Sequence, residues 1–165
     1  MAQEALQQTQ VLAWELAGLA CADVLPEPES SDYCAHTLTL GGRSAAFRVG
    51  KITPTKAGHF VTLWVRSKEG PIRPFDASDG VQLFIVNVTE GGRRGLFVFP
   101  AAELAGRGVM SLDGKGGKRA IRVYAPWVET ASAQASKTQA WQLQHFLHVA
   151  PGPVDPVRAR ELFAA

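Results

Sequence analysis

The stretch VQLFIVNVTEGGRRGLFVF, residues 81–99, decides the fold. Both of its apolar halves are rich in Val, Ile and Phe, which are typical of strands. The pair Gly91-Gly92 between them is typical of a tight hairpin turn. Working outward, a second hairpin is predicted from strands over residues 33–40 and 43–49, joined by Gly41-Gly42. Two such hairpins indicate a sheet that is antiparallel or mixed.

Further elements are predicted on either side of these hairpins. FVTLWV, residues 60–65, is apolar at nearly every position, as in a central strand covered on both faces. One more strand is predicted over residues 120–124, and Pro26 and Pro28 indicate an acidic linker. Helical spacing of apolar residues predicts helices over residues 2–20 and 132–148. Pro100 predicts the start of a short helix over residues 101–105, and Asp155-Pro156 predicts the start of another at the end of the chain. The sequence thus predicts an α/β (α+β) protein with one domain over residues 1–165: a central mixed or antiparallel sheet of about five to six strands, flanked by N- and C-terminal helices.

The composition is that of a globular domain, since hydrophobic residues make up 46% of the 165 positions. No apolar run approaches the roughly 20 residues of a membrane span, and the first residues lack the basic start of a signal peptide. We therefore expect a cytoplasmic protein without a membrane partner. Cys21 and Cys34 are then expected to be reduced rather than bridged.

Charge is unevenly distributed along the chain. Residues 1–32 carry six acids and no Lys or Arg, whereas residues 33–165 carry all 17 basic residues against nine acids. This asymmetry favours a positively charged face that attracts polyanions. The alternative is that the predicted helix over residues 2–20 folds back and neutralises the basic part internally.

The first basic cluster lies in the stretch RVGKITPTKAGHF, residues 48–60. Arg48, Lys51 and Lys56 fall at a strand end and in a turn stiffened by Pro54. Gly58 would let another backbone approach closely. Fixed cations next to free backbone N–H groups are typical of phosphate binding, which is the role we predict for the three cations. A basic, solvent-exposed hairpin without a ligand is the alternative.

The second basic cluster follows a glycine-rich loop, residues 113–118. Lys118, Arg119 and Arg122 are predicted to bind phosphate there, with Tyr124 and Trp127 as stacking platforms for bases. The loop lacks the spacing of a Walker A motif and does not lead from a strand into a helix. Trp127 has an alternative role as a core or edge residue.

Hydrolysis of nucleic acid would need carboxylates that converge on a divalent metal. The candidate acids are Glu27, Glu29, Asp32, Asp76, Asp79 and Asp113. If the protein were a nuclease, Asp32 and Lys51 would be the catalytic candidates. An acid that precedes a strand is, however, more often a turn former.

These stretches together resemble the MepB family of small bacterial accessory proteins. The matching motifs are RxxKxTPTKxGxFVxLW (48–64), GPIxPF (70–75), FxFP (97–100), GKRxxRVYxPW (117–127) and KTQxWQxxxF (137–146). They cover residues 32–147 in order. The resemblance implies a fold similar to that of restriction-endonuclease-like nucleases, and an association with nucleic acid.

The sequence departs from the nuclease motif that this resemblance implies, an acid two residues before a lysine on a strand. Val49 stands two residues before Lys51, and Asp113-Gly114-Lys115 lies in a glycine-rich loop. We therefore expect a protein that grips the phosphate backbone of DNA or RNA in a basic cleft without catalysis and without a cofactor. The alternatives are a metal-dependent nuclease with an atypical carboxylate set, requiring a divalent metal, and a partner of an acidic protein.

Overall fold

The computed structural model describes residues 2–9, 13–15, 17–66 and 70–164. Its largest sheet has six strands in the order β1-β2-β3-β8-β9-β11. These strands are β1 (Cys21–Pro26), β2 (His36–Leu40), β3 (Arg43–Val49), β8 (Leu83–Glu90), β9 (Arg93–Pro100) and β11 (Phe146–Ala150). Strands β3 and β8 are parallel, and the other neighbours are antiparallel. The mixed α+β fold and the sheet of about five to six strands are thus confirmed; the likeness to restriction endonucleases stays a prediction.

The predicted hairpin of β8 and β9 is present, and both of its strands lie inside this sheet, between β3 and β11. The two strands pair from Leu83 with Pro100 to Glu90 with Arg93. Leu83 and Ile85 belong to the hydrophobic core on one face of the sheet, and Phe84 and Val86 to the core on the other. The sheet is therefore covered on both faces, which explains the continuous apolar runs.

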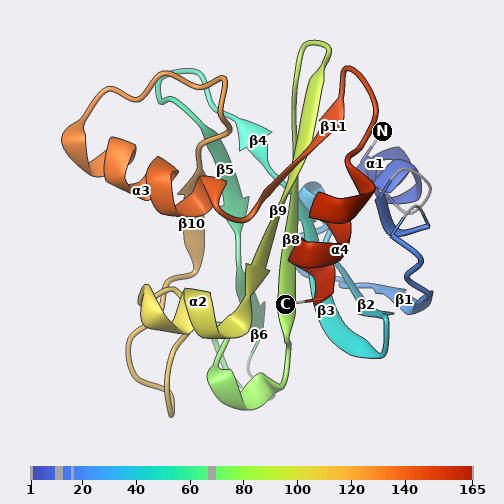
Figure 1. Cartoon of the computed structure of the whole chain (residues 1–165). Coiled ribbons are helices and arrows are strands. Elements are labelled where there is room, and N and C mark those ends of the chain that lie inside the picture. Colours follow the sequence, from blue (N-terminus) through green and yellow to red (C-terminus); the bar gives the residue numbers. More distant parts are fainter. Residues whose placement is uncertain (1, 10–12, 16, 67–69, 165) are drawn as a thin grey trace.

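One face of the six-stranded sheet is covered by the two ends of the chain. Helices α1 (Ala2–Thr9) and α4 (Pro156–Ala164) lie here, on the side away from α3 (Ala133–Leu143) (Figure 1). Trp14 is fully buried between Phe47 and Phe163, with its ring centroid 6.3 Å from each of theirs. This tryptophan joins the N-terminal segment to the C-terminal helix.

The opposite face is covered by two small sheets and two helices (Figure 1). A three-stranded sheet has the order β10-β5-β4 and a two-stranded sheet pairs β6 with β7. Their strands are β4 (Lys51–Ile52), β5 (His59–Thr62), β6 (Trp64–Arg66), β7 (Ile72–Pro74) and β10 (Ala120–Val123); the helices are α2 (Ala101–Gly106) and α3. Short 3-10 turns at Ser31–Tyr33 and Ala77–Asp79 complete this layer. The three-stranded sheet and α3 position the candidate site.

Four sequence predictions differ from the structure. The apolar run 60–65 is not one strand buried on both faces, because it divides at Leu63 between β5, the middle strand of the small three-stranded sheet, and β6. The predicted helix 2–20 does not reach residue 20: α1 covers Ala2–Thr9 and residues 17–20 are not helical, while residues 10–12 and 16 lie outside the described part. The predicted linker at Pro26 contains β1, and the predicted helix 132–148 ends at Leu143 and is followed by β11.

Two smaller predictions have clear outcomes. Cys21 and Cys34 are not joined in a disulfide, as expected. Among the described residues, no helix is both long enough and apolar enough to cross a membrane.

Candidate nucleic-acid interface

The three-stranded sheet carries a row of alternating cationic and aromatic side chains. Phe60 on β5 is paired with Arg122 on β10 and with Lys51 on β4. Directly opposite residues of antiparallel strands project on the same side of a sheet, so the three side chains are neighbours. The Arg122 guanidinium lies over the Phe60 ring, 5.6 Å from its centroid. We call this set, Arg122–Phe60–Lys51, the cation–aromatic row.

Tyr33 extends the row beside Lys51. The Lys51 ammonium lies 4.6 Å from the centroid of the Tyr33 ring, and that ring is 6.3 Å from the Phe60 ring. Each cation therefore faces an aromatic ring, an arrangement that holds a charge in place without neutralising it.

The turn over residues 53–58 is fastened to β10 and aligns the row. Arg122 donates hydrogen bonds to Thr53 Oγ1 at 2.8 Å and to the carbonyl of Ala57 at 3.2 Å. Gly58 has φ of +81°, and a Cβ at this position would lie 2.7 Å from the carbonyl oxygen of Val123. The prediction that Gly58 lets another backbone approach is confirmed.

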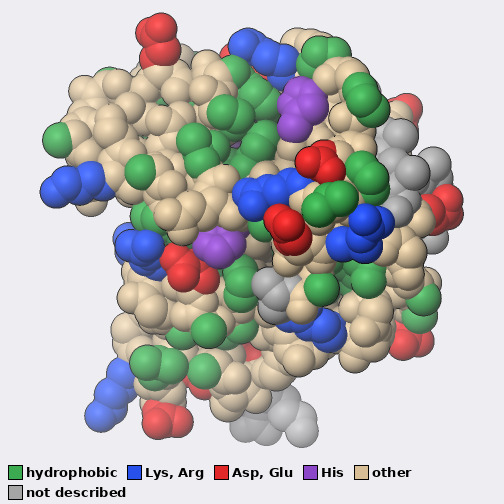
Figure 2. Space-filling view, viewed as in Figure 1, with side chains coloured by type: hydrophobic (Ala, Val, Ile, Leu, Met, Phe, Trp, Pro, Cys, Tyr) green, Lys and Arg blue, Asp and Glu red, His purple; other side chains and the backbone are tan. Residues whose placement is uncertain are grey.

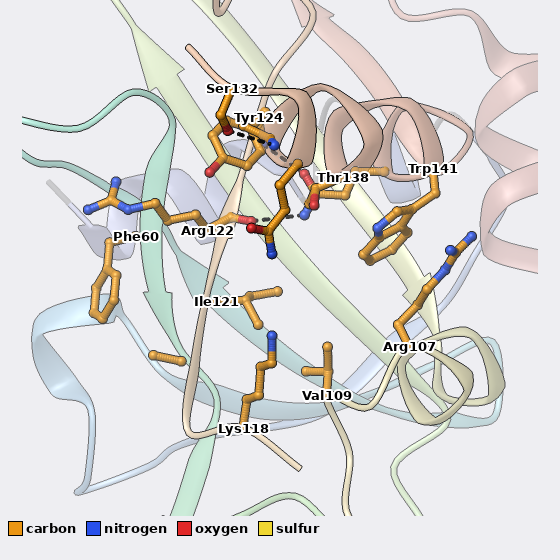
Figure 3. A pocket seen from close by; sticks show the side chains of 14 residues that line it. Phe60, Arg107, Val109, Lys118, Ile121, Arg122, Tyr124, Ser132, Thr138 and Trp141 are labelled. Carbon is orange, nitrogen blue, oxygen red and sulfur yellow. Dashed lines mark hydrogen bonds between the residues drawn. The ribbon is translucent and has the colours of Figure 1, made fainter. Parts of the chain in front are cut away.

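A groove of about 470 Å³ opens beside the Arg122 end of the row. Strand β10 and helix α3 both border it, and Tyr124 lies beside Ser132 near the start of α3 (Figure 3). Its charged lining residues are Arg107, Lys118 and Arg122, and its aromatic ones are Phe60, Tyr124 and Trp141. Among the described lining residues none is acidic. A groove lined by cations and aromatic rings suits an anion that carries planar rings.

Two of the groove's cations differ in whether an acid pairs with them. The Lys118 side chain points toward the middle of the groove (Figure 3). Arg107 lies over the Trp141 ring, 4.8 Å from its centroid, and its Nε is 3.0 Å from the Glu103 carboxylate. No described acid pairs with Lys118, so its charge is available to a ligand.

Gln142 sets the distance between α3 and β10. This buried side chain accepts a hydrogen bond from the backbone N–H of Tyr124 and donates one to the carbonyl of Arg122, each at 2.9 Å. Ser132 caps the start of α3 by accepting from the N–H of Ala135 at 3.1 Å. The wall of the groove is thereby fixed to the strand that carries Arg122.

Asp76 anchors the glycine-rich loop that leads to Lys118. Its carboxylate accepts hydrogen bonds from the hydroxyls of Ser111 and Ser78, each at 2.6 Å, and from the N–H of Gly114 at 2.9 Å. These donors, led by Ser111, hold the pKa of Asp76 far below its ordinary value. The loop is therefore tied at Gly114 rather than free along its length.

Asp76→Asn is expected to lower the melting temperature at neutral pH, because an amide cannot accept from all of these donors. The folded-state pKa is depressed, so the stabilisation is complete above the unfolded value of about 3.9 and is lost as the pH falls through the folded value. In melting curves recorded from pH 7 downward, the gap between wild type and variant should narrow below about pH 4. Asp113→Asn, an exposed acid in the same loop, is the control and should leave the curves unchanged. A gap of constant size would contradict the role given to the Asp76 charge.

Arg48 is not available to a phosphate, which corrects its predicted role. The side chain is fully buried, and its Nη2 lies 2.8 Å from the Glu27 carboxylate. It also donates to the carbonyls of Thr62 at 3.2 Å and Phe47 at 3.0 Å. Burial lowers the pKa of this guanidinium, and Glu27 opposes that shift. Arg48 therefore joins the main sheet to the small one.

The remaining predicted binding residues are divided. Lys51, Lys118, Arg122 and Tyr124 lie in the row or the groove. Lys56 and Arg119 are exposed but line neither of the cavities described here, and their phosphate contacts stay predictions. Trp127 is not a free stacking platform, because Arg93 lies over its ring and the ring packs edge-on against Phe146.

Most candidate carboxylates have structural partners. Glu29 pairs with Arg66 and Asp79 with Arg73, which lowers the pKa of both acids. Glu27 and Asp76 have the partners given above. Within the described ranges, no three His, Cys, Asp or Glu side chains come together to hold a metal ion. Asp32 and Lys51 line one cavity, described below, but the nuclease alternative gains no carboxylate set from these positions.

Two acids of the N-terminal 32 residues neutralise basic residues, although they follow the predicted helix 2–20 rather than belong to it. Glu27 and Glu29 each pair with an arginine from the later part of the chain. Figure 2 shows acidic and basic side chains intermixed on the face turned to the viewer. Positive charge on that face is therefore not gathered into one patch.

Sequence reasoning missed Phe60, Arg107 and Trp141 as groove residues. Phe60 becomes a site residue through the strand register that places it between Lys51 and Arg122. A signal was present, because Phe60, Lys51 and Arg122 all belong to the motifs quoted above. Arg107 and Trp141 meet only through the packing of α2 near α3, which no local pattern reveals.

Comparison with known proteins gives consistent results. A family model described as MepB-like matches residues 27–148. A solved structure, "Crystal Structure of MepB", is 30% identical with a TM-score of 0.76, and the match covers 80% of this chain and 89% of that one. No curated protein matches the sequence. The family match spans most of the chain and agrees with the motifs, so the chain belongs to the MepB-like family.

Proposed function

We propose that this protein binds single-stranded nucleic acid along the groove and the cation–aromatic row, without cleaving it. The observation that carries the proposal is the alignment of Lys51, Phe60 and Arg122 next to a groove whose charged residues are all cations. Phosphates of the bound strand would contact Lys118 and Arg122 in the groove, and then Lys51 at the far end of the cation–aromatic row.

The aromatic residues favour a single strand over a duplex. A base stacks on a protein ring only when it has left its own stack, and such contacts contribute about 1–3 kcal/mol per base. Tyr124 lines the groove, and no other described ring or cation is stacked over it. Tyr124 is therefore the platform best placed for a base, with phosphates on the cations to either side.

Lys118→Ala is expected to weaken binding of a labelled single-stranded oligonucleotide and to reduce the salt slope of log K by about 0.7, the value for one phosphate contact on a single strand. Lys115→Ala is the matched control, because Lys115 is an exposed lysine of the same loop that does not line the groove. Fluorescence anisotropy at several salt concentrations measures both quantities. Each variant loses one positive charge, so a difference in affinity or salt slope between them reflects where the lysine lies.

Equal behaviour of the two variants would show that only general charge matters and would refute the proposed groove. Absence of salt-sensitive binding in the wild-type protein would refute nucleic-acid binding as a whole. Cleavage of the oligonucleotide in the presence of Mg²⁺ or Mn²⁺ would show that the protein does more than bind.

A further inference from the structure

A second cavity, of about 900 Å³, lies at the Lys51 end of the cation–aromatic row. Helix α1 forms one wall, and the ends of β3, β8 and β9 form the others. The residues that matter for its chemistry are Gln8, Asp32, Lys51, Asn87 and Arg94. Because Lys51 belongs both to this cavity and to the row, the row leads from the groove into the cavity.

The polar groups of the cavity are of two kinds. Arg94 is committed to the protein, since its Nε donates to Asn87 Oδ1 at 3.0 Å and its Nη1 donates to Gln8 Oε1. Asp32, by contrast, forms no hydrogen bond or ion pair with a described residue. Lys51 contacts the Tyr33 ring but no described acid. One carboxylate acceptor and one ammonium donor are therefore left for a ligand.

We infer that this cavity is a recognition site for one unstacked base of the bound strand, with Asp32 accepting a hydrogen bond from an exocyclic amino group. The inference rests on the proposed function and names the kind of base that the same surface prefers. A carboxylate accepts from the amino group of cytosine, whereas uracil presents a carbonyl oxygen at the same position, which the carboxylate repels.

Three features of the cavity favour a base over a second phosphate. Its size falls within the 300–1,000 Å³ typical of small-ligand sites. Asp32 and Glu4 oppose the charge of Lys51 and Arg94, so the cavity as a whole does not attract an anion. Tyr33 and Phe60 connect the cavity with the groove by aromatic faces along which a flexible strand can pass.

The test compares oligodeoxynucleotides of equal length made of cytosine or of uracil, which differ in the group under test at C4, amino or carbonyl, and in the proton on the neighbouring N3. The wild-type protein should bind the cytosine strand roughly tenfold more tightly. Asp32→Ala should bring the two affinities together, by weakening cytosine relative to uracil. Glu161→Ala is the matched control, because it removes an equal charge from an exposed position on α4, across the main sheet from the row.

The outcomes separate the inference from the function on which it rests. A cytosine preference that is lost in the Asp32 variant and kept in the Glu161 variant supports the inference. Equal wild-type affinities, or a preference that persists without Asp32, overturn it and leave binding itself intact. If neither oligonucleotide binds the wild-type protein, the proposed function and the inference fail together.

Discussion

Glu27→Ala is expected to lower the free energy of unfolding by about 3–5 kcal/mol, the cost of removing one partner of a buried ion pair. The substitution leaves Arg48 fully buried and positively charged without a counterion. The arginine would still donate to the carbonyls of Thr62 and Phe47, but these bonds do not neutralise its charge. Urea or guanidinium unfolding followed by tryptophan fluorescence measures the loss.

Glu29→Ala is the control for this prediction. Glu29 also pairs with an arginine, but Arg66 and Glu29 are both solvent-exposed, so the unfolding midpoint should stay near that of the wild type. The double change Glu27→Leu with Arg48→Met should recover much of the stability, because it removes both charges from the interior. If Glu27→Ala and Glu29→Ala had equal effects, the pair of Glu27 and Arg48 would not be a buried ion pair in solution.

Gly58→Ala is expected to reduce stability by about 3 kcal/mol and to weaken nucleic-acid binding as well. The left-handed backbone costs an L-residue about 1–2 kcal/mol, and overpacking adds about 1–3 kcal/mol. The added methyl would lie 2.7 Å from the carbonyl oxygen of Val123 and 2.8 Å from Cδ1 of Tyr124. Relief of these contacts has to move the turn away from β10, and with it the carbonyl of Ala57 that accepts from Arg122.

Gly42→Ala separates the two causes. Gly42 has the same φ of +81°, but no atom of the described residues lies within 4 Å of an added Cβ. In this control the free energy of unfolding should fall only by the cost of the left-handed backbone, and the affinity for nucleic acid should not change. The Gly58 variant should lose both stability and affinity. Denaturant unfolding and oligonucleotide titration on the same preparations measure the two quantities. Identical unfolding of the two variants would mean that the contact with β10 does not constrain the turn.

The central hairpin was predictable because its information is local. Strand-forming residues on both sides of Gly91-Gly92 specify β8 and β9 whatever surrounds them, and the same holds for Gly41-Gly42 between β2 and β3. The apolar run 60–65 shows the limit of such reasoning. A short apolar run fits any buried strand, and the break at Leu63 depends on the pairing of β5 with β10 and of β6 with β7.

Strand β11 was missed for a related reason. Leu143 and Leu147 are four residues apart, which fits a helix, yet the helix ends at Leu143 and Leu147 pairs with Leu96 on β9. A short segment whose apolar pattern fits both a helix and a strand adopts the structure that its tertiary contacts favour, which here is pairing with β9.

The candidate site was predictable in its chemistry but not in its arrangement. Lys51, Lys118, Arg122 and Tyr124 were identified from basic clusters with adjacent aromatic residues. Arg48 fits the same pattern, but it forms a buried ion pair with Glu27, which lies 21 residues earlier in the chain. Strand alternation places Arg48 on the same side as Ala46, in the core between the two sheets. Such a long-range partner leaves no local signal.

The three-stranded sheet has a consequence for how the protein is made. Its strands come from residues 51–52, 59–62 and 120–123, and the whole β8–β9 hairpin lies between the second and the third. Because a ribosome delivers the chain from the N-terminus, Lys51 and Phe60 emerge well before Arg122, Lys118 and the wall formed by α3. A nascent chain thus carries only half of the proposed binding surface, and that surface is complete only after the last third of the chain has been synthesised and has docked.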